Sequence, residues 1–505
     1  MKEKRSEIKS GAFLSYVYIF VSFAVTFLYT PFLIKYLGNS EYGVYSLAIA
    51  ILGYMEMLGA GMFSTYVKFA SKTKSEEELA KLNGLIFKIY MAFAAMAIIF
   101  GIVLSVRLEA IFIELNSIEI SKLKVLLYMM LGNVVLTSIN GIFESNIIYN
   151  ENFNFQKSIN IVKKILLPLI SIPLLIIGYK IYVVGIITIL ANLIVLLSNV
   201  CYCFKKNSMK ISFKKYEGKI LKTILGFYVF VFLSILIDQI NWSIDSVIIG
   251  RLRGTFEVTI YAAASSINSV FLLFATGISS VFITRIHKTK SDDNKTYLDM
   301  VTKVGRIQFV LLLLMLTGFI FFGQRFIELW LGQEYLDAYI IALLLTCPLV
   351  FIVVKSVLTE IYRAKNKHVA RTIIYLIMAV LNAIISYFLC MKYGAIGSAV
   401  GTTISLVIGN LFIMNIYDHK VVGINMFKFW KSLLAMLKGI ILPIIFGLVC
   451  MKFISFDNLI VYGGSILAYT GIYLLSFWFL SLNTNEKETV FSVLRKIPVI
   501  RKVIK

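Results

Sequence analysis

Ionisable side chains interrupt several long apolar runs of this sequence, and their chemistry needs an explanation first. A charge at the centre of a membrane-spanning helix costs roughly 2.5 to 3.5 kcal/mol on insertion scales, so such residues tend to mark pathways for ions or polar substrates. The five that lie deepest in their runs are Glu56, Lys88, Asp238, Asp245 and Lys355. We interpret the acids Glu56, Asp238 and Asp245 as candidates for ion coupling.

Asp238, Asn241 and Asp245 follow one another at i, i+3 and i+7. In a helix this spacing places all three on one face, which cannot be turned toward lipid. Two explanations remain open: the face lines a water-filled cavity, or basic side chains of a neighbouring element neutralise it. Arg251 and Arg253 are near enough in sequence to reach back to Asp245.

The buried cations point to an anionic substrate. Lys355 lies eight residues before Arg363, about 12 Å along a helix, which favours a cavity role, whereas Lys88 is near enough to a helix end for snorkelling to explain it equally well. Lys68 and Arg285, at helix ends, are expected to line a cytoplasmic entrance together with Arg306. Lys and Arg bind phosphate through charge-assisted hydrogen bonds, so pyrophosphate is the candidate headgroup. The predicted substrate set is Lys68, Lys88, Asn241, Arg285 and Lys355.

The elements that position these residues are membrane helices. The 505 residues are 59% hydrophobic, above the roughly 45 to 50% expected of a soluble domain, and their mean hydropathy is +0.85. The apolar runs predict an all-α polytopic membrane protein of about fourteen spans, of which 158–179 and 432–453 are the least regular. The predicted spans are 11–36, 41–70, 82–106, 122–148, 158–179, 181–204, 220–250, 257–286, 304–328, 334–363, 369–391, 393–417, 432–453 and 457–481.

The net charge of +23 lies in the loops, so it does not indicate nucleic-acid binding. With these spans, 38 of the 50 Lys and Arg fall on the side of the two termini and 10 on the other side. Cytoplasmic loops carry the excess of basic residues in membrane proteins. Both termini are therefore expected in the cytoplasm.

An internal repeat organises the chain. Residues 37–45 and 252–261 both join one apolar run to the next through Gly, Glu and Tyr, at an offset of 215 or 216 residues. Because the offset covers six helices, the copies share one membrane orientation, as in transporters built from parallel repeats. The predicted domains are an N-lobe 1–204, a basic linker 205–219, a C-lobe 220–417, two further helices within 418–481, and a basic tail 482–505. The predicted structural corners contain Pro31, Gly38, Gly43, Tyr45, Gly250 and Tyr261.

The sequence lacks the motifs of several enzyme classes. It contains no G-x-x-x-x-G-K-[ST] loop and no H-E-x-x-H, and its three histidines fall in loops or at helix ends. The five cysteines have no zinc or disulfide spacing and are interpreted as apolar filler. We expect no metal, no cofactor and no enzymatic activity.

Pro31, the corner at 37–45, the glycine-bearing stretch 58–61, and Asp245 followed by Ile-Ile-Gly at 248–250 resemble the polysaccharide flippases of the multidrug/oligosaccharidyl-lipid/polysaccharide exporter superfamily. The resemblance extends over nearly the whole chain. It implies a multi-pass protein of the bacterial plasma membrane that moves an undecaprenyl-pyrophosphate-linked oligosaccharide, for O-antigen or capsule, from the inner to the outer leaflet. It also implies alternating access coupled to an ion gradient or to the membrane potential, with glycosyltransferases or a polymerase of the same pathway as partners.

Two alternatives stay open. A cation-coupled drug exporter of the same superfamily needs acidic and aromatic cavity walls, whereas Lys88 and Lys355 favour an anion. A membrane glycosyltransferase or polymerase needs a sizeable outer loop with catalytic acids, and the longest predicted outer loop, 107–121, offers only Glu109, Glu114 and Glu119 in a weak pattern.

Overall fold

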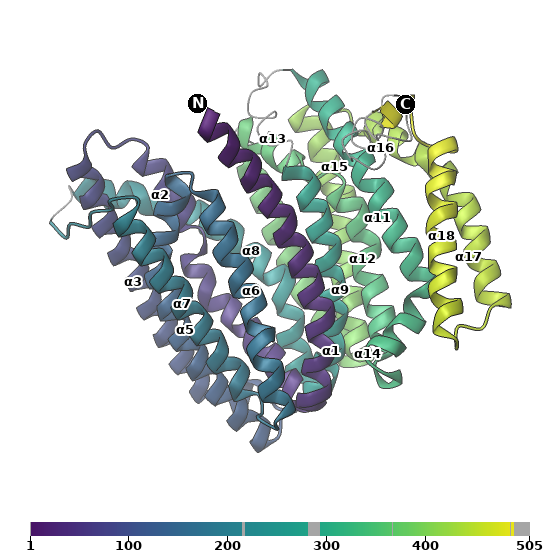
Figure 1. The fold of residues 1–505 in the computed structure, drawn as a ribbon, viewed down its shortest axis with the longest axis horizontal. Helices are drawn as coiled ribbons and strands as arrows, with labels where there is room; N and C mark the ends of the chain where they lie inside the picture. Colours follow the sequence, from purple (N-terminus) through teal and green to yellow (C-terminus); the bar gives the residue numbers. More distant parts are fainter. Residues whose placement is uncertain (1, 215–217, 281–292, 366, 485, 489–505) are drawn as a thin grey trace. The chain divides into compact units, whose positions relative to one another are not determined.

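The computed structural model describes residues 2–214, 218–280, 293–365, 367–484 and 486–488, and the regular structure in these ranges is helical throughout (Figure 1). Twelve described segments are long and apolar enough to cross a membrane. Two of them, Val17–Ala70 and Val369–Val422, are 54 residues long, although about 20 residues suffice for one crossing. Each of these two accounts for two crossings. The predicted all-α polytopic fold with about fourteen spans is confirmed.

Glycine corners divide the two double-length segments. Gly38 in α1 (Lys2–Ala60) has φ +77°, and Gly394 in α14 (His368–Leu406) has φ +61°. Positive φ is strained for L side chains but open to glycine, so the chain can turn sharply at these points without a loop. The first of these glycines belongs to the corner that the repeat predicts.

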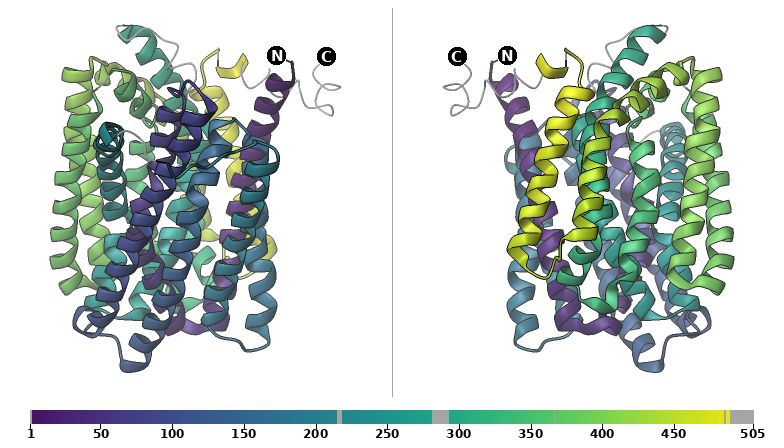
Figure 2. Two further views of the ribbon diagram at one scale, coloured as in Figure 1. Left: turned by 90° about the vertical axis from the view of Figure 1, so that its left-hand side faces the viewer. Right: turned by 90° about the vertical axis from the view of Figure 1, so that its right-hand side faces the viewer.

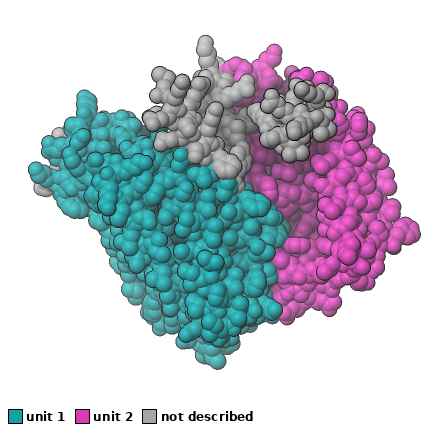
Figure 3. Space-filling view, in the orientation of Figure 1, with its two compact units in different colours: residues 1–270, 370–405 teal, residues 271–369, 406–505 magenta. Residues whose placement is uncertain are grey.

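The chain packs as two compact units, each described here by itself (Figure 3). Unit 1 comprises residues 1–270 and 370–405. It contains α1, α2 (Met62–Ala70), α3 (Glu76–Val106), α4 (Leu108–Ile111), α5 (Ser117–Tyr149), α6 (Phe153–Ile176), α7 (Tyr182–Lys205), α8 (Gly218–Leu252), most of α9 (Thr255–Ser280), and α14 from residue 370 to residue 405.

Unit 2 comprises residues 271–369 and 406–505. Its complete helices are α11 (Asn294–Trp330), η1 (Gln333–Tyr335), α12 (Asp337–Val353), α13 (Leu358–Ala364), η2 (Val407–Ile413), α15 (Met414–Tyr417), η3 (Asp418–Val422), α16 (Met426–Leu434), η4 (Ala435–Ile440), α17 (Ile441–Phe453) and α18 (Leu459–Leu480). The last two form an antiparallel pair (Figure 2). The division into repeat lobes at 204, 219, 417 and 481 stays a prediction.

The two least regular predicted spans are both helical. The span predicted at 158–179 is α6, which begins five residues earlier, at Phe153. The span predicted at 432–453 is formed by the end of α16, then η4, a 3₁₀ segment that contains Lys438, and α17. The earlier start of α6 places Lys163 ten residues beyond Phe153, about 15 Å along the helix axis.

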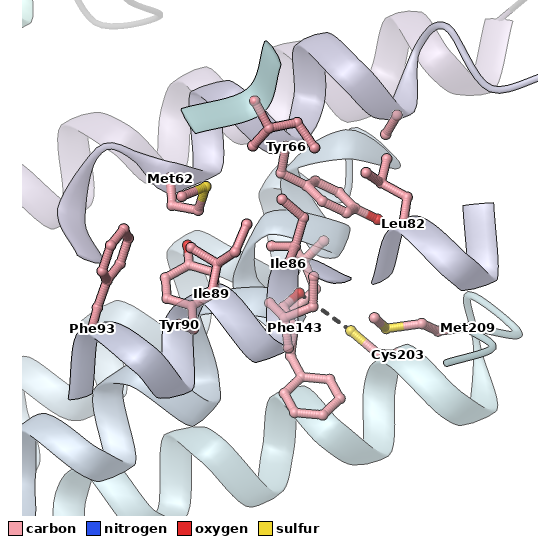
Figure 4. Close-up of a cluster of buried hydrophobic side chains, with 14 of the residues drawn as sticks. Met62, Tyr66, Leu82, Ile86, Ile89, Tyr90, Phe93, Phe143, Cys203 and Met209 are labelled. Carbon is pink, nitrogen blue, oxygen red and sulfur yellow. Dashed lines mark hydrogen bonds between the residues drawn. The ribbon is translucent and has the colours of Figure 1, made fainter. Parts of the chain in front are cut away.

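A cluster of buried side chains holds α2, α3, α5 and α7 together (Figure 4). Tyr66 and Ile86 are fully buried in it, and the thiol of Cys203 donates to the carbonyl oxygen of Phe143 at 3.3 Å. Met209, from the loop after α7, also packs into the cluster. This packing sets the rotation of α3 and α5, and so determines which of their residues face the cavity described next.

Candidate functional site

Unit 1 contains a partly open cavity of about 460 Å³ between the second half of α1 and helices α3, α5 and α6. Sites for small molecules typically have volumes of about 300 to 1,000 Å³. Its polar lining consists of Glu56, Thr137, Ser138, Glu144, Gln156 and Lys163, and its aromatic lining of Phe63, Tyr90 and Phe93. Among the predicted site residues that the structure describes, Glu56 lines this cavity.

Three charged side chains face one another across the cavity. The Glu56 carboxylate accepts a hydrogen bond from the Asn133 amide at 3.5 Å, and the Glu144 carboxylate accepts one from the Gln156 amide at 3.2 Å. Lys163 is attracted by both carboxylates. Within the described part of the chain its ammonium group has no hydrogen-bond partner, so it remains available to a ligand.

The sequence did not predict this trio. In the sequence, Glu144 lies near the end of the predicted span 122–148 and Lys163 near the start of the predicted span 158–179. The earlier start of α6 places Lys163 well inside the membrane helix. The sequence does contain a signal for this position of Lys163. Lys163 and Lys164 are followed by ten largely apolar residues, so they lie too deep in the apolar run to be ordinary basic residues of a cytoplasmic loop.

The aromatic wall is held in place from behind. The Tyr90 hydroxyl lies 3.3 Å from the Ser145 hydroxyl, and the Tyr90 ring lies so close to Gly141 that a Cβ atom there would come within 2.4 Å of it. Phe93 stacks on Tyr228, with ring centroids 5.1 Å apart. The rings are therefore fixed by their unit before any ligand binds.

Asp245 lies in a second polar site within unit 1. Its carboxylate is 1% exposed and accepts hydrogen bonds of 2.7 Å from the hydroxyls of Tyr261, Ser398 and Thr402. The Thr402 hydroxyl oxygen also lies 3.2 Å from the side-chain oxygen of Asn382. Helices α9 and α14 thus supply a shell of hydroxyl groups around one carboxylate of α8.

Arg251 and Arg253 do not neutralise this carboxylate, contrary to the sequence-based expectation. Arg251 donates to the Ile111 carbonyl at 3.1 Å. Arg253 donates to the carbonyls of Cys390 and Met391, at 3.1 and 2.6 Å. Both guanidinium groups satisfy carbonyl groups at helix ends, which otherwise lack partners.

The polar face predicted in the span 220–250 lies on α8, and its three residues have different surroundings. Asp238 is exposed and Asn241 half-buried, while Asp245 is buried. Arg371 of α14 is the positive charge that acts on Asp238. The basic-neighbour explanation is supported for Asp238, through the charge of Arg371. Neither explanation describes Asp245, which is buried among hydroxyls.

Lys355 lies in the turn between α12 and α13 and is 6% exposed. Its ammonium group donates to the Asn410 carbonyl at 2.7 Å and to the Asn415 side chain at 3.1 Å. Asp418 is fully buried and pairs with Lys355 at 3.5 Å, and it also accepts a hydrogen bond from Tyr362. Unit 2 itself satisfies this lysine, which joins α12 to the π-helical segments η2 and η3.

Of the other predicted cations, Lys68 lies in the last turn of α2 and Lys88 within the first half of α3. Lys88 is exposed and donates to the Phe213 carbonyl at 3.3 Å, which ties α3 to the basic linker. Lys68 is exposed and lies 3.4 Å from the centre of the Phe227 ring. Arg285 falls outside the described residues.

Arg306 is engaged by partners within unit 2, and its place at a cytoplasmic entrance stays a prediction. It is 9% exposed and forms an ion pair with Glu486 at 2.5 Å. It also donates to the carbonyls of Ser432 and Ser481. Arg306 thus fastens α11 to the segments on either side of the α17 and α18 pair.

The two predicted corners contact each other within unit 1. A Cβ atom at Gly43 would lie 2.1 Å from the Thr255 carbonyl oxygen, so only glycine fits at this approach. The Thr259 hydroxyl donates to the Asn39 carbonyl at 2.8 Å. Glu119 accepts hydrogen bonds of 2.6 Å from hydroxyls of both corners, Ser40 and Thr255.

The remaining corner residues pack beside this contact. A Cβ atom at Gly250 would lie 2.5 Å from the Leu47 side chain, and Tyr45 packs on Tyr42 with ring centroids 6.3 Å apart. Tyr261 belongs to the Asp245 shell. Pro31 lies inside α1.

Comparisons with known proteins agree with this architecture. A family model described as polysaccharide biosynthesis protein matches residues 32–340. A Shigella flexneri protein whose name describes an O-antigen transporter is 21% identical over 399 residues, which cover 77% of this chain and 92% of that protein. The capsular polysaccharide biosynthesis protein CapF of Staphylococcus aureus is 27% identical over 172 residues, or 34% of this chain and 43% of CapF.

Solved structures share the fold. The lipid II flippase MurJ in an inward closed conformation superposes with a TM-score of 0.75 at 19% identity, covering 92% of this chain and 98% of that one. An inward-facing multidrug transporter of the MATE family, in the MOP superfamily, superposes with a TM-score of 0.60 at 14% identity, covering 83% and 99%. At these identities the likeness establishes the fold.

Proposed function

Because this chain belongs to the polysaccharide biosynthesis protein family, we propose that it is a flippase for an undecaprenyl-pyrophosphate-linked oligosaccharide. It moves this lipid from the inner to the outer leaflet of a bacterial plasma membrane by alternating access, with both termini in the cytoplasm. Glycosyltransferases that build the oligosaccharide and a polymerase that consumes it are the partners this role requires.

The cavity in unit 1 is the observation that carries the proposal. Three charged side chains, Glu56, Glu144 and Lys163, surround a space of about 460 Å³ between membrane helices. Charged groups at this depth are costly unless they face water or a polar ligand. A protein that passes a hydrophilic headgroup through the membrane needs such a space, whereas a purely structural bundle does not.

Cationic side chains supply contacts for the pyrophosphate in this proposal. Lys68 and Lys88 are exposed, so they can attract an anionic headgroup, and Arg285 and Asn241 belong to the same predicted set. Lys355 is assigned a supporting role, because its ammonium group already pairs with Asp418 inside unit 2.

Ion coupling is assigned to the Asp245 shell, with Glu56 and Asp238 as further acids. A carboxylate that is buried among neutral hydroxyls lacks a compensating charge, and such a group is stabilised when it binds a proton or a cation. The shell joins α8, α9 and α14. Its occupancy can therefore bias how these helices pack, which links an ion gradient to a conformational change.

The corner contact is assigned the role of an outer gate. Gly43, Asn39 and Ser40 on one side meet Thr255 and Thr259 on the other. These corners occupy equivalent positions of the internal repeat. Separating them is the simplest way to open a path toward the outer face.

A drug exporter remains the second candidate, favoured by the combination of Glu56 and Glu144 with Tyr90 and Phe93 in one cavity. Aromatic and acidic walls bind organic cations. Transport tests separate the two functions, because a drug exporter moves an organic cation such as rhodamine and ignores a lipid-linked sugar.

The test is reconstitution of the whole chain into vesicles that contain a fluorescent polyprenyl-pyrophosphate-linked oligosaccharide. Transfer between leaflets is followed by the access of a membrane-impermeant oxidant to the sugar, with and without an imposed ion gradient. Protein-dependent transfer supports the proposal. Turnover of a sugar donor without transfer of the lipid would contradict it and favour an enzyme.

A further inference from the structure

The charges of the unit 1 cavity define its ligand more closely than the proposed function requires. Two carboxylates, Glu56 and Glu144, face one ammonium group, Lys163. When all three are ionised their sum is negative, so a phosphate group at this position is repelled. The cavity is thus poorly suited to the pyrophosphate of a lipid-linked sugar.

The neutral hydroxyl groups of a sugar can form hydrogen bonds both with carboxylates and with an ammonium group. Each sugar hydroxyl can donate to a carboxylate and accept from an ammonium group, and hydrogen bonds to charged groups are roughly twice as strong as neutral ones. Lys163 has no hydrogen-bond partner among the described residues. Gln156, Thr137 and Ser138 add further polar groups at the wall.

The aromatic wall suits the less polar face of a sugar ring. Tyr90 is held at its ring by Gly141 and near its hydroxyl by Ser145, and Phe93 is held by Tyr228. Rings that are already fixed lose little entropy when a ligand packs against them. Polar groups and fixed rings therefore line the same cavity.

We propose that this cavity is the subsite for the glycan portion of the substrate, and that it binds neutral sugar residues while the pyrophosphate is held elsewhere. Glu56 and Glu144 accept hydrogen bonds from sugar hydroxyls, Lys163 donates to them, and Tyr90 and Phe93 contact the ring. This proposal rests on the proposed flippase function. It adds that the glycan and the pyrophosphate of the substrate bind at two different positions of the protein.

Binding measurements on the whole chain in lipid nanodiscs test the division. One probe is a polyprenyl pyrophosphate that carries the neutral disaccharide chitobiose, and the other is the same polyprenyl pyrophosphate without sugar. The variants are Glu56→Gln, Glu144→Gln and Lys163→Gln. Lys164→Gln is the matched control, because Lys164 is the next residue of α6, is similarly half-buried, and does not line the cavity.

We expect Lys163→Gln to weaken binding of the sugar-bearing probe by about tenfold, which corresponds to the loss of one charge-assisted hydrogen bond. Binding of the sugar-free probe should stay within about twofold of the wild type, and Lys164→Gln should change neither. Thr137→Trp, which fills the cavity without altering a charge, should also weaken only the sugar-bearing probe. Thermal unfolding of each variant separates loss of binding from loss of fold.

Equal weakening of both probes would overturn the glycan subsite and would place the pyrophosphate, or a purely structural role, at these residues. Unchanged binding of the sugar-bearing probe in all variants would also overturn it. Failure of the proposed function has a different signature: the wild-type protein would bind the probes in nanodiscs but would not transfer the sugar-bearing probe in vesicles.

Discussion

The Thr259 hydroxyl donates a hydrogen bond to the backbone carbonyl of Asn39 at 2.8 Å, although 220 residues separate them. The two residues belong to corners that the internal repeat places in equivalent positions. The repeat therefore has a physical consequence: its two copies provide the two sides of one contact within unit 1. This contact is the basis of the first two predictions.

Replacing Gly43 by alanine should destabilise the protein. The new Cβ atom would lie 2.1 Å from the Thr255 carbonyl oxygen, and steric overpacking of this kind costs about 1 to 3 kcal/mol. Gly132→Ala is the matched control, because a Cβ atom at Gly132 meets no heavy atom within 4 Å. Thermal unfolding in detergent measures both, and equal midpoints would show that the corners can separate without cost.

Thr259→Val should loosen the corner contact without changing the size of the side chain. Removing a hydrogen bond to a backbone carbonyl costs about 0.5 to 1.5 kcal/mol. Backbone amides in 37–45 and 252–261 should then exchange faster with deuterium, because local opening becomes easier. If the amides of both segments exchange in the variant at the wild-type rates, this hydrogen bond does not hold the corner contact together.

Asp245→Asn should abolish the response of transport to an ion gradient while the fold persists. The amide oxygen can still accept hydrogen bonds from the Tyr261 and Thr402 hydroxyls, and the amide N–H can donate to the Ser398 hydroxyl. Replacing a buried charge by a neutral group is often neutral or stabilising. Leaflet transfer with and without a gradient gives the readout. If an applied gradient still accelerates leaflet transfer by the Asp245→Asn variant, ion coupling must be assigned to another acidic residue.

Lys355 and Asp418 should behave as a coupled pair in unfolding experiments. Removing either partner leaves the other charge buried, at a cost of about 3 to 5 kcal/mol, whereas removing both should cost much less. The cycle uses Lys355→Met, Asp418→Asn and the double variant, with unfolding measured in mixed micelles. The exposed pair Lys210–Glu76 serves as control, since surface ion pairs contribute little, and additive effects at Lys355 and Asp418 would exclude coupling.

Asp238→Ala should abolish transport without affecting membrane insertion. Asp238 is exposed on α8 and is acted on by the charge of Arg371, so its loss changes the electrostatics of a pathway more than the packing of a core. Expression level and thermal midpoint should match the wild type while leaflet transfer is lost. Full transport in this variant would remove Asp238 from the mechanism.

Much of the fold could be predicted because it follows from local properties of the chain. Apolar runs of sufficient length predict membrane helices, since backbone groups inside a bilayer must be satisfied within the segment. The glycine at 38 predicts a corner because it can adopt positive φ. The depth of Glu56, Asp245 and Lys355 in their runs indicated that each needs a polar environment.

The partners of these residues could not be predicted, because they depend on how the helices rotate and pack. A membrane helix that is apolar on all sides carries no pattern that shows which face turns inward. The packing of α6 on α1 and α5 brought Lys163 into one cavity with Glu56 and Glu144. Packing also turned Arg251 and Arg253 toward helix-end carbonyls and away from Asp245.

The sequence by itself thus determined the class of protein, the number of spans, the repeat and the residues that carry charge into the membrane. Hydropathy, glycine positions and charge in the loops are sufficient for these, since each acts over one or two helical turns or one span. The tertiary structure decided the cavity in unit 1, the hydroxyl shell of Asp245 and the buried pair of Lys355 with Asp418. These arise from contacts between residues that are distant in the sequence, and only the packing of whole helices brings such residues together.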